Sequence, residues 1–265
     1  MSIPRIIHQL WVTKDNSNQS YPSRYENMRK TLLEHNQDFT FKVWLDKDIL
    51  ALFDDPNLTH FKKVYLKMKY PISKADFARI VLIYTQGGIY IDLDFYGYRP
   101  LTHLLNQYPN NHTIITKEFD EGGPAMIYNG FIATYPRNPF FLGFLEYMNQ
   151  VMSHRSQIGI DVVGTTGPLA LHLYAETLPS DDPNLQWREW LIPTTLLLPH
   201  NKQGIIRPEV TEEPYVGTLW IEGSKWSTTV NTDLPANVLV GYAIVIPVLI
   251  LLVIVFVAWA RNNNR

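Results

Sequence analysis

The segment from Pro71 to Phe95 limits the possible folds of this chain more than the rest of its sequence, because it predicts a helix that changes into a strand within two residues. Ser73 and Asp76 have the spacing of a capping box at the start of this helix. Gly87 is suited to end it, and Ile89 to Phe95 is rich in β-branched and aromatic residues. Apolar residues recur with helical spacing at Phe77, Ile80, Val81 and Tyr84.

Strand and helix patterns alternate along the rest of the chain. Ile3 to Val12 and Phe39 to Leu45 are predicted strands, and a helix between them is expected from Ser23, with Glu26 completing a capping box, to about His35. This order argues for an α/β fold with a largely parallel sheet. Later expected elements are a strand at Thr113–Phe119 and helices that begin at Asn138-Pro139 and Gly167-Pro168.

Asp92 and Asp94 lie two residues apart on the strand predicted after Gly87. Period-two geometry places both carboxylates on one side of that strand. Two neighbouring carboxylates repel each other and attract a divalent cation, and Mg²⁺ or Mn²⁺ prefers such oxygen ligands. A solvated strand edge is the alternative interpretation, because two aspartates with this spacing are a weak signal by themselves.

The predicted helix before that strand is apolar nearly all round, yet it carries Asp76, Arg79 and Gln86 along one stripe. A local ion pair between Asp76 and Arg79 is the simplest explanation for the presence of these two charged residues on the helix. A polar stripe on a buried helix needs partners, and the hydroxyl and phosphate groups of a ligand would supply them.

These residues resemble the DXD region of glycosyltransferase family 32, and the related region of the large clostridial glucosylating toxins. The resemblance rests on Asp-Phe-Ala-Arg at 76–79 and on Tyr-Thr-Gln-Gly-Gly-Ile-Tyr-Ile-Asp-Leu-Asp at 84–94. It implies a GT-A-type nucleotide-sugar-binding fold, a Rossmann-like α/β fold with a mixed sheet. It also implies that Asp76 and Arg79 contact the donor sugar. Asp92 would contact the ribose or a metal, and Asp94 would bind Mn²⁺ or Mg²⁺ on the diphosphate.

Three further segments are similar to the same family. In the opening strand, Trp11 would lie against the nucleotide base, although a core position is the alternative for any tryptophan. Asn129 would lie near the donor sugar, whereas Asn-Gly by itself is a common turn dipeptide. Thr166-Gly167-Pro168 matches a turn that leads into a helix. The similarity therefore covers roughly residues 3 to 226.

One departure from the family concerns the metal site. Members of the family usually carry a histidine near the C-terminal Ser-Trp segment, but residues 217–226 contain none. Glu222, or water, would then supply the missing ligand. His8 and His103 are interpreted as structural histidines, because a lone histidine rarely binds a metal.

The 23 residues from Val238 to Ala260 carry no charge. As a helix they would span about 34 Å, which is enough to cross a membrane. We therefore expect a catalytic domain at 1–227, a linker at 228–237, a transmembrane helix at 238–260 and a polar tail at 261–265. No signal peptide is evident at the N-terminus. Arg261 and Arg265 favour a cytoplasmic tail, which places the catalytic domain in the lumen of the Golgi or another endomembrane compartment. The alternative is that a lone C-terminal helix inserts after synthesis and leaves the catalytic domain in the cytosol.

The resemblance implies a retaining transferase that moves a hexose from a nucleotide sugar to a lipid or glycan acceptor. Among family members, the chain most resembles the enzymes that transfer mannose from GDP-mannose to inositol phosphorylceramide, and these imply a regulatory membrane subunit as a partner. Initiation-specific mannosyltransferases are similar too. The net charge of -2, with scattered basic residues, argues against nucleic acid as a partner. No cysteine is present, which excludes disulfides and thiolate metal sites.

Two alternatives to this enzyme remain at the level of sequence. Without the family histidine, the chain could bind a nucleotide sugar or glycan without turnover, as a pseudoenzyme. A phosphatase of the haloacid dehalogenase type also places two aspartates after a strand, but it needs a Thr or Val soon after the second, where Phe95 and Tyr96 stand. Metal-dependent hydrolysis of a donor sugar would separate all three.

Overall fold

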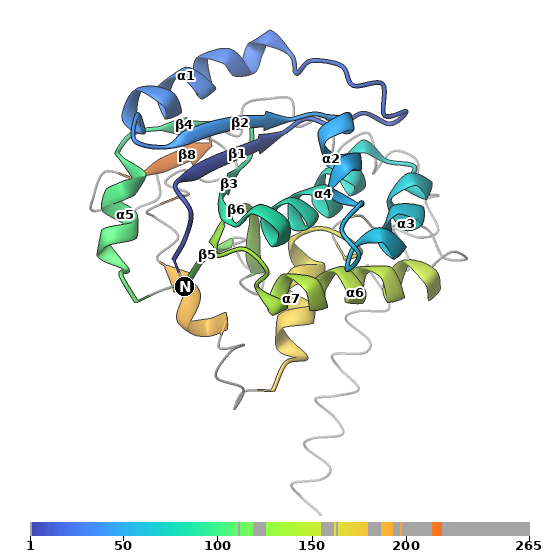
Figure 1. Ribbon diagram of the computed structural model, residues 1–265. Coiled ribbons are helices and arrows are strands. Elements are labelled where there is room, and N and C mark those ends of the chain that lie inside the picture. Colours follow the sequence, from blue (N-terminus) through green and yellow to red (C-terminus); the bar gives the residue numbers. More distant parts are fainter. Residues whose placement is uncertain are drawn as a thin grey trace, which may run out of the picture.

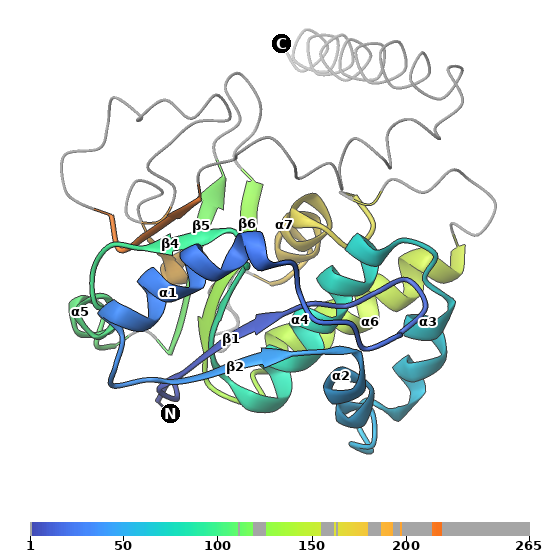
Figure 2. The ribbon, with the colours of Figure 1, turned by 90° about the horizontal axis from the view of Figure 1, so that it is seen from above.

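The computed structural model describes residues 2–110, 112–118, 126–154, 162, 164–179, 187–192, 197 and 214–218. Within this part, six strands form one mixed sheet with helices on both of its faces, as Figures 1 and 2 show. The strand order is β2-β1-β3-β6-β5-β7, and β4 pairs with β8 in a separate sheet. The strands are β1 (Ile6–Leu10), β2 (Thr40–Trp44), β3 (Gly88–Ile91), β4 (Phe95–Gly97), β5 (Thr113–Glu118), β6 (Met126–Thr134), β7 (Leu191–Ile192) and β8 (Val216–Thr218).

The sheet contains parallel and antiparallel pairs, and β5 pairs in parallel with β7. β1 pairs in parallel with β2 and with β3, whereas β6 runs antiparallel to both β3 and β5. The helices are α1 (Glu26–His35), α2 (Asp46–Leu52), α3 (Lys62–Lys67), α4 (Pro71–Gln86), α5 (Leu101–Gln107), α6 (Pro139–His154) and α7 (Pro168–Glu176), with short 3₁₀ turns at Ser23–Tyr25, Thr59–Phe61 and Trp187–Trp190.

Buried apolar side chains form two clusters, which lie on opposite faces of the sheet. Successive residues of a strand point to opposite faces, and accordingly Tyr90 joins one cluster while Ile89 and Ile91 join the other. The first cluster contains α4, α6 and α7, and the second contains residues of α1 and α5. Figure 1 shows α1 on one side of the sheet and α6 and α7 on the other. The sheet is therefore covered on both faces, as is typical of α/β proteins.

The junction between α4 and β3 depends on two glycines. Gly87 has φ +63° and Gly88 has φ +83°, in the left-handed region that side chains disfavour. A Cβ atom on Gly87 would lie 2.6 Å from the backbone nitrogen of Pro136, and one on Gly88 would lie 2.7 Å from the carbonyl oxygen of Ile6. This close approach lets the chain leave α4 and enter the sheet beside β1 at once.

Several helix and strand predictions are confirmed. α4 covers the predicted apolar pattern and ends before Gly87, and β5 matches the predicted strand at 113–119 within one residue. α6 begins at Pro139 with the Asn138 side chain accepting a hydrogen bond from the Phe140 N–H at 3.0 Å. α7 begins at Pro168 after Gly167. No separate helix was predicted at α2, α3 or α5, and no strand at β6.

The strand predicted from Ile89 to Phe95 is wrong in its second half. β3 ends at Ile91, and the Phe95 N–H donates to the Asp92 carbonyl at 3.3 Å, which closes a turn before β4. Asp92 and Asp94 therefore lie on a turn, so the period-two argument for their shared face does not apply. The Asn129-Gly130 dipeptide lies inside β6 and not in a turn.

Both predicted capping boxes are also wrong. α1 begins at Glu26, after a 3₁₀ turn, and no side chain caps it. α4 begins earlier than Ser73, because Tyr70 precedes a proline at the first helical position. Asp76 is therefore inside the helix, and its carboxylate turns toward other elements.

The apolar run 238–260 lies outside the described residues. Among the residues that the structure describes, no helix is long and apolar enough to cross a membrane.

Candidate active site

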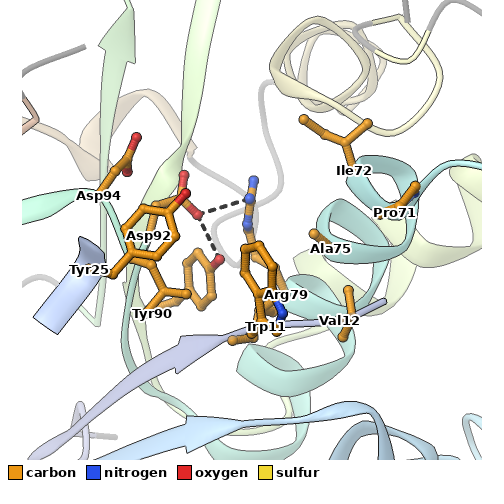
Figure 3. A pocket seen from close by; sticks show the side chains of 12 residues that line it. Trp11, Val12, Tyr25, Pro71, Ile72, Ala75, Arg79, Tyr90, Asp92 and Asp94 are labelled. Atoms are coloured by element: carbon orange, nitrogen blue, oxygen red, sulfur yellow. Dashed lines mark hydrogen bonds and ion pairs between the residues drawn. The ribbon is translucent and has the colours of Figure 1, made fainter. Parts of the chain in front are cut away.

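A cavity of about 180 Å³ opens where β1 and β3 end (Figure 3). The carboxyl ends of parallel strands meet at one edge of a sheet, which is where α/β proteins bind ligands. Trp11 directly follows β1, and Asp92 directly follows β3. The first turns of α4 supply another wall, and the lining residues are Leu10, Trp11, Val12, Tyr25, Pro71, Ile72, Ala75, Arg79, Tyr90, Asp92, Leu93 and Asp94.

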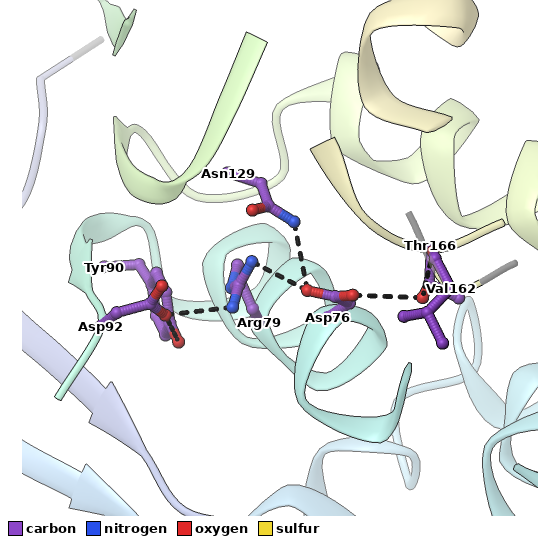
Figure 4. Close-up of polar contacts among 7 residues, drawn as sticks. All are labelled: Asp76, Arg79, Tyr90, Asp92, Asn129, Val162 and Thr166. Atoms are coloured by element: carbon purple, nitrogen blue, oxygen red, sulfur yellow. Dashed lines mark hydrogen bonds and ion pairs between the residues drawn. The ribbon is translucent and has the colours of Figure 1, made fainter. Parts of the chain in front are cut away.

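Arg79 lies between two carboxylates, as Figure 4 shows. Its Nη1 is 3.0 Å from Oδ1 of Asp76, and its Nη2 is 3.0 Å from Oδ1 of Asp92. The Tyr90 hydroxyl donates to the same Asp92 oxygen at 2.6 Å. The local ion pair expected from the sequence is therefore confirmed, and it is one half of a larger network.

Asp76 is held from two further directions. The Asn129 amide of β6 donates to its Oδ1 at 3.1 Å, and the Thr166 hydroxyl, next to α7, donates to its Oδ2 at 3.2 Å (Figure 4). All of these side chains are buried, with Asp76 only 5% and Arg79 only 6% exposed. Three segments that are far apart in the sequence thus fix one carboxylate.

The network carries more negative than positive charge. Burial raises the pKa of Asp76 to about 6, although the positive charge of Arg79 opposes this rise. Burial opposes the charge of Arg79, but the nearby Asp92 and Tyr90 hold its pKa above the ordinary value, so the guanidinium stays charged. Burial also raises the pKa of Tyr90, which remains a neutral hydrogen-bond donor. With Asp94 on the same cavity, an added cation or a cationic complex is favoured.

One wall of the cavity is aromatic. The rings of Trp11 and Tyr25 lie 6.0 Å apart between centroids, and both side chains are partly exposed. Trp11 therefore lines the cavity and is not a core residue. A flat, partly exposed ring offers a surface on which a planar group can stack.

The structure gathers most of the site residues that the sequence predicts. Trp11, Arg79, Asp92 and Asp94 line the cavity, and Asp76 lies buried behind Arg79. Gln86, the last residue of α4, does not line it. Asn129 contacts Asp76, whereas Glu222 lies outside the described residues.

Sequence reasoning missed Tyr25, Tyr90 and the contact of Thr166. A signal existed only for Tyr90, which stands two residues before Asp92 on a strand. The positions of Tyr25 and Thr166 depend on how distant segments pack.

The donor atoms at this cavity fit a hard divalent cation with an incomplete protein shell. Asp92 and Asp94 offer carboxylate oxygens, and Mg²⁺ or Mn²⁺ commonly takes one or two carboxylates together with substrate phosphates and water. No cluster of three His, Cys, Asp or Glu side chains suited to a metal occurs among the described residues. In sites of this kind, substrate phosphate oxygens and water commonly complete the shell.

His8 has the structural role expected for it. It is 1% exposed, its Nε2 bonds the Gly87 carbonyl at 3.0 Å, and its Nδ1 accepts from the Trp44 indole at 3.1 Å. Burial lowers its pKa to about 4, so the ring is neutral and fixed in one tautomer. His103 is exposed on α5.

Comparison with known proteins identifies the central segment. Residues 22–114 match the family model of the glycosyltransferase sugar-binding region containing the DXD motif. The chain is 29% identical over 191 residues to mannosyl phosphorylinositol ceramide synthase SUR1 of Saccharomyces cerevisiae, covering 72% of this chain and 44% of that protein. It is 30% identical over 156 residues to inositol phosphoceramide mannosyltransferase 1 of Schizosaccharomyces pombe, covering 58% of this chain and 44% of that protein.

A solved structure shares the fold. The ligand-free glycosyltransferase domain from the YGT toxin superimposes with a TM-score of 0.51 at 10% identity, over 72% of this chain and 80% of that domain. The GT-A-like fold with a mixed sheet is thus confirmed, as is the resemblance to the DXD-containing family. These matches favour the glycosyltransferase interpretation of the sequence over the phosphatase alternative. The chain spans less than half the length of these two curated relatives.

Proposed function

Because residues 22–114 carry the DXD-containing sugar-binding region of glycosyltransferases, we propose that this chain transfers a hexose from a nucleotide sugar to a lipid or glycan acceptor, with retention of anomeric configuration. The observation that carries the proposal is the placement of Arg79. This guanidinium joins the buried carboxylate of Asp76 to the partly exposed carboxylate of Asp92, at the wall of a cavity that Trp11 and Asp94 also line.

Mannose is the proposed sugar, and GDP-mannose the proposed donor. Both curated relatives described above are named for mannosyl transfer, and their names include inositol phosphoceramide or a mannosylated form of it. The Trp11 ring would stack on the base, while Asp76 and Arg79 would bind sugar hydroxyls. Asn129 and Thr166 support this assignment, because their hydrogen bonds to the Asp76 carboxylate fix its orientation.

Departure of the nucleoside diphosphate requires stabilisation of negative charge. Asp94, with Asp92, would hold a divalent cation, preferably Mn²⁺, which supplies Lewis-acid stabilisation of the diphosphate oxygens when bound. Arg79 and Tyr90 fix the position of the Asp92 carboxylate, since the Arg79 Nη2 and the Tyr90 hydroxyl both donate to one of its oxygens. The other Asp92 oxygen is left for the metal or the ribose.

We propose transfer on one face of the sugar, because the carboxylates that the structure describes at this cavity have other assigned roles. The carboxylates of Asp76 and Asp92 are already bound to Arg79. The bond from the anomeric carbon to the diphosphate would break, with its electron pair leaving on the phosphate oxygen. The acceptor oxygen would then bond the same face and release its proton to the departing diphosphate.

Membrane attachment belongs to this proposal. Residues 1–227 would form the catalytic domain, residues 228–237 the linker, and the apolar run 238–260 a single-pass anchor in an endomembrane such as the Golgi. An anchor suits a lipid acceptor, because both partners then meet at the membrane surface. A regulatory membrane subunit is a further proposed partner.

The test of the function is Mn²⁺-dependent hydrolysis of GDP-mannose, UDP-galactose and UDP-glucose by the full chain in detergent. GDP-mannose should be hydrolysed fastest, and Asp94→Asn should lower that rate by at least about tenfold while the melting temperature stays close to that of wild type. Asp54→Asn, on an exposed carboxylate, is the matched control.

The outcomes separate the remaining alternatives. Normal turnover by Asp94→Asn would remove Asp94 from the mechanism. Binding of a nucleotide sugar by the wild-type chain without any turnover, with or without Mn²⁺, would instead support a pseudoenzyme.

A further inference from the structure

The loop that follows β1 is held by two buried charged side chains that have no part in the mechanism described above. Residues 13–18 form this loop, which continues from Trp11 and Val12 in the wall of the cavity beside α4. We call that cavity the donor cavity. Another of its walls belongs to α4, where Ala75 and Arg79 line it (Figure 3). The positions of the 13–18 loop and of α4 therefore shape the donor cavity.

Lys74 of α4 contacts the 13–18 loop. Its Nζ donates to the carbonyl oxygens of Lys14 at 2.6 Å and of Thr13 at 3.4 Å, and to Oδ1 of Asn16 at 3.0 Å. An ammonium group has three N–H donors, so these three oxygens use all of them. Lys74 is only 1% exposed, and the loop therefore takes the place of water around its charge.

The other surroundings of Lys74 also suit a buried ammonium group. The ring centroid of Tyr65 in α3 lies 5.6 Å from Nζ, within the range of a cation–π contact. Burial lowers the pKa of Lys74, while the negative charges of Asp46 and Asp15 oppose this change. Leaving a buried charge without partners costs free energy, so the contacts of Lys74 favour the observed position of the loop.

Asp46 holds the same loop from α2. Its buried carboxylate accepts hydrogen bonds from the Thr13 N–H at 3.1 Å, the Thr13 hydroxyl at 2.8 Å and the Asn18 N–H at 3.1 Å. Asn16 and Asn18 both have φ +57°, in the left-handed region. Asparagine tolerates this region, but residues other than glycine adopt it at a cost in free energy. The contacts to Lys74 and Asp46 offset that cost.

Trp11 is connected to these contacts through a single intervening residue. Its N–H donates to the Trp44 carbonyl at 2.9 Å, which extends the pairing of β1 with β2 beyond the end of β1. Thr13 then bonds Asp46 through its N–H and Lys74 through its carbonyl. The backbone is thus fixed on both sides of the residue after Trp11, and this determines where the indole lies relative to α4.

We propose that Lys74 and Asp46 are positioning residues that fix the nucleotide-binding side of the donor cavity. They act through the 13–18 loop on Trp11, which would stack on the base. Arg79, on the same helix as Lys74, would contact the sugar. One helix then sets the separation between the groups that bind the two ends of the donor. This assignment rests on the proposed transferase function, because it concerns how the donor of that reaction is bound.

The test measures nucleotide binding to the full chain in detergent with Mn²⁺ by calorimetry. The ligands are GDP, GDP-mannose, UDP and UDP-glucose. Lys74→Met keeps a long side chain but removes the ammonium group. It should weaken the preferred nucleoside diphosphate and its sugar derivative by the same factor, at least about threefold, because stacking of the base contributes to the binding of both. A chain that is only destabilised would show a lower binding stoichiometry with unchanged affinity.

Steady-state hydrolysis of the donor gives a second measure. The KM of Lys74→Met should rise by about the factor found in binding, while kcat stays close to that of wild type, because the loss is equal in the ground state and the transition state. A lower kcat with an unchanged KM would contradict a role in nucleotide binding.

A double-mutant cycle shows whether Lys74 acts through Trp11. Trp11→Ala should weaken both the nucleoside diphosphate and the nucleotide sugar. Adding Lys74→Met to Trp11→Ala should cause little further loss, because the ring that Lys74 positions is already absent. Losses that multiply in the double variant would overturn the proposal.

Asn16 provides a test that does not depend on the folding of Lys74→Met. Asn16→Gly keeps the left-handed backbone accessible and removes one acceptor of the ammonium group, so it should weaken both ligands equally. Asn16→Asp keeps an acceptor and should bind like wild type. Lys63→Met, on an exposed lysine of α3, is the matched control and should also bind like wild type.

The outcomes separate this proposal from the proposed function. Wild-type affinities in both Lys74→Met and Asn16→Gly would overturn the positioning role alone. A loss confined to the nucleotide sugar would also overturn it, because that pattern assigns Lys74 to the sugar. Failure of the wild-type chain to bind any of the four ligands would reject the proposed function and the positioning role together.

Discussion

At the scale of single residues, Arg79 links the stability of the fold to the chemistry of the cavity. It forms ion pairs with two carboxylates that are both withdrawn from solvent, Asp76 almost completely and Asp92 in part. The sequence suggested that Asp76 and Arg79 would matter for sugar binding and not for folding. The observed geometry gives Arg79 a structural role in addition, because removal of one partner leaves buried charge uncompensated.

We expect Arg79→Ala to lower the free energy of unfolding by about 3–5 kcal/mol, because two carboxylates lose their partner. Arg79→Lys keeps the positive charge and should lower the free energy of unfolding by less. It should still weaken GDP-mannose binding more than GDP binding, since one ammonium cannot bond both carboxylates in the same way. Urea denaturation and calorimetry measure the two effects. Arg188→Ala breaks an exposed ion pair with Glu176 and should cost below about 1 kcal/mol. A cost as small for Arg79→Ala would contradict the buried network.

His8 predicts how stability depends on pH. Its pKa is about 4 in the folded chain, below the value of about 6.5 expected in the unfolded chain. Between these values the unfolded chain binds more protons, so the free energy of unfolding rises with pH in this window. The contribution of His8 is complete above about pH 6.5 and is lost as the pH falls toward 4.

The comparison of wild type with His8→Gln isolates this contribution. The stability advantage of wild type should shrink by about 2 kcal/mol between pH 7 and pH 4.5, because glutamine does not titrate. Denaturation midpoints at several pH values measure the change. An advantage that stays constant over this range would show that His8 is not buried as a neutral ring.

At the scale of elements, β6 determines how the turn with Asp92 and Asp94 is placed. The Asp92 N–H donates to the Gly130 carbonyl of β6 at 3.0 Å. A Cβ atom on Gly130 would lie 2.5 Å from Oδ2 of Asp92 and 2.4 Å from the Tyr128 hydroxyl. Gly130 is therefore required by the close approach of the carboxylate to the strand.

Gly130→Ala should displace the Asp92 carboxylate and reduce donor hydrolysis by at least about tenfold, because the displaced group can no longer hold its position at the cavity. Gly143→Ala is the matched control, since its Cβ would meet the Tyr174 hydroxyl at 2.1 Å in the core between α6 and α7. Both variants should lose stability. Only Gly130→Ala should lose more activity than the decrease in its folded fraction explains. Steady-state rates and thermal unfolding measure the two quantities. Full activity of Gly130→Ala would show that Asp92 need not occupy this position.

At the scale of the whole molecule, both faces of the sheet are covered, and the cavity lined by Trp11, Arg79 and Asp94 lies beside the start of α4. The proposed anchor at 238–260 would keep this region near a membrane. Its orientation can be tested at Asn57, because this residue begins an Asn-Leu-Thr sequon and is exposed just before a 3₁₀ turn.

In a lumenal arrangement, Asn57 should gain a glycan when the full chain is synthesised with microsomes, because Arg261 and Arg265 favour the cytoplasmic side for the tail. A mobility shift that disappears in Asn57→Gln and after glycosidase treatment measures this. Asn57→Gln should leave donor hydrolysis unchanged. Protease cleavage of the catalytic domain in sealed microsomes, without glycan attachment, would place it in the cytosol.

Local sequence patterns determined α4, α6 and α7 and the residue types at much of the site. Some features depend on residue type and backbone geometry within a few residues. They are the apolar period of α4, the glycines that end it, and the Asn-Pro and Gly-Pro starts of α6 and α7. Hence these features were predictable. The residue types at 76, 79, 92 and 94 also indicated carboxylate and guanidinium chemistry, and the match to a known motif indicated its use.

Only the tertiary structure decided how those groups meet. The turn at Asp92 depends on the Gly130 carbonyl of another strand, and the orientation of Asp76 depends on Asn129 and Thr166, which lie 53 and 90 residues away. The capping-box prediction for Asp76 failed for the same reason. Partners at such distances in the sequence leave no local pattern, because burial in the packed interior, and not backbone spacing, selects which polar groups must find each other.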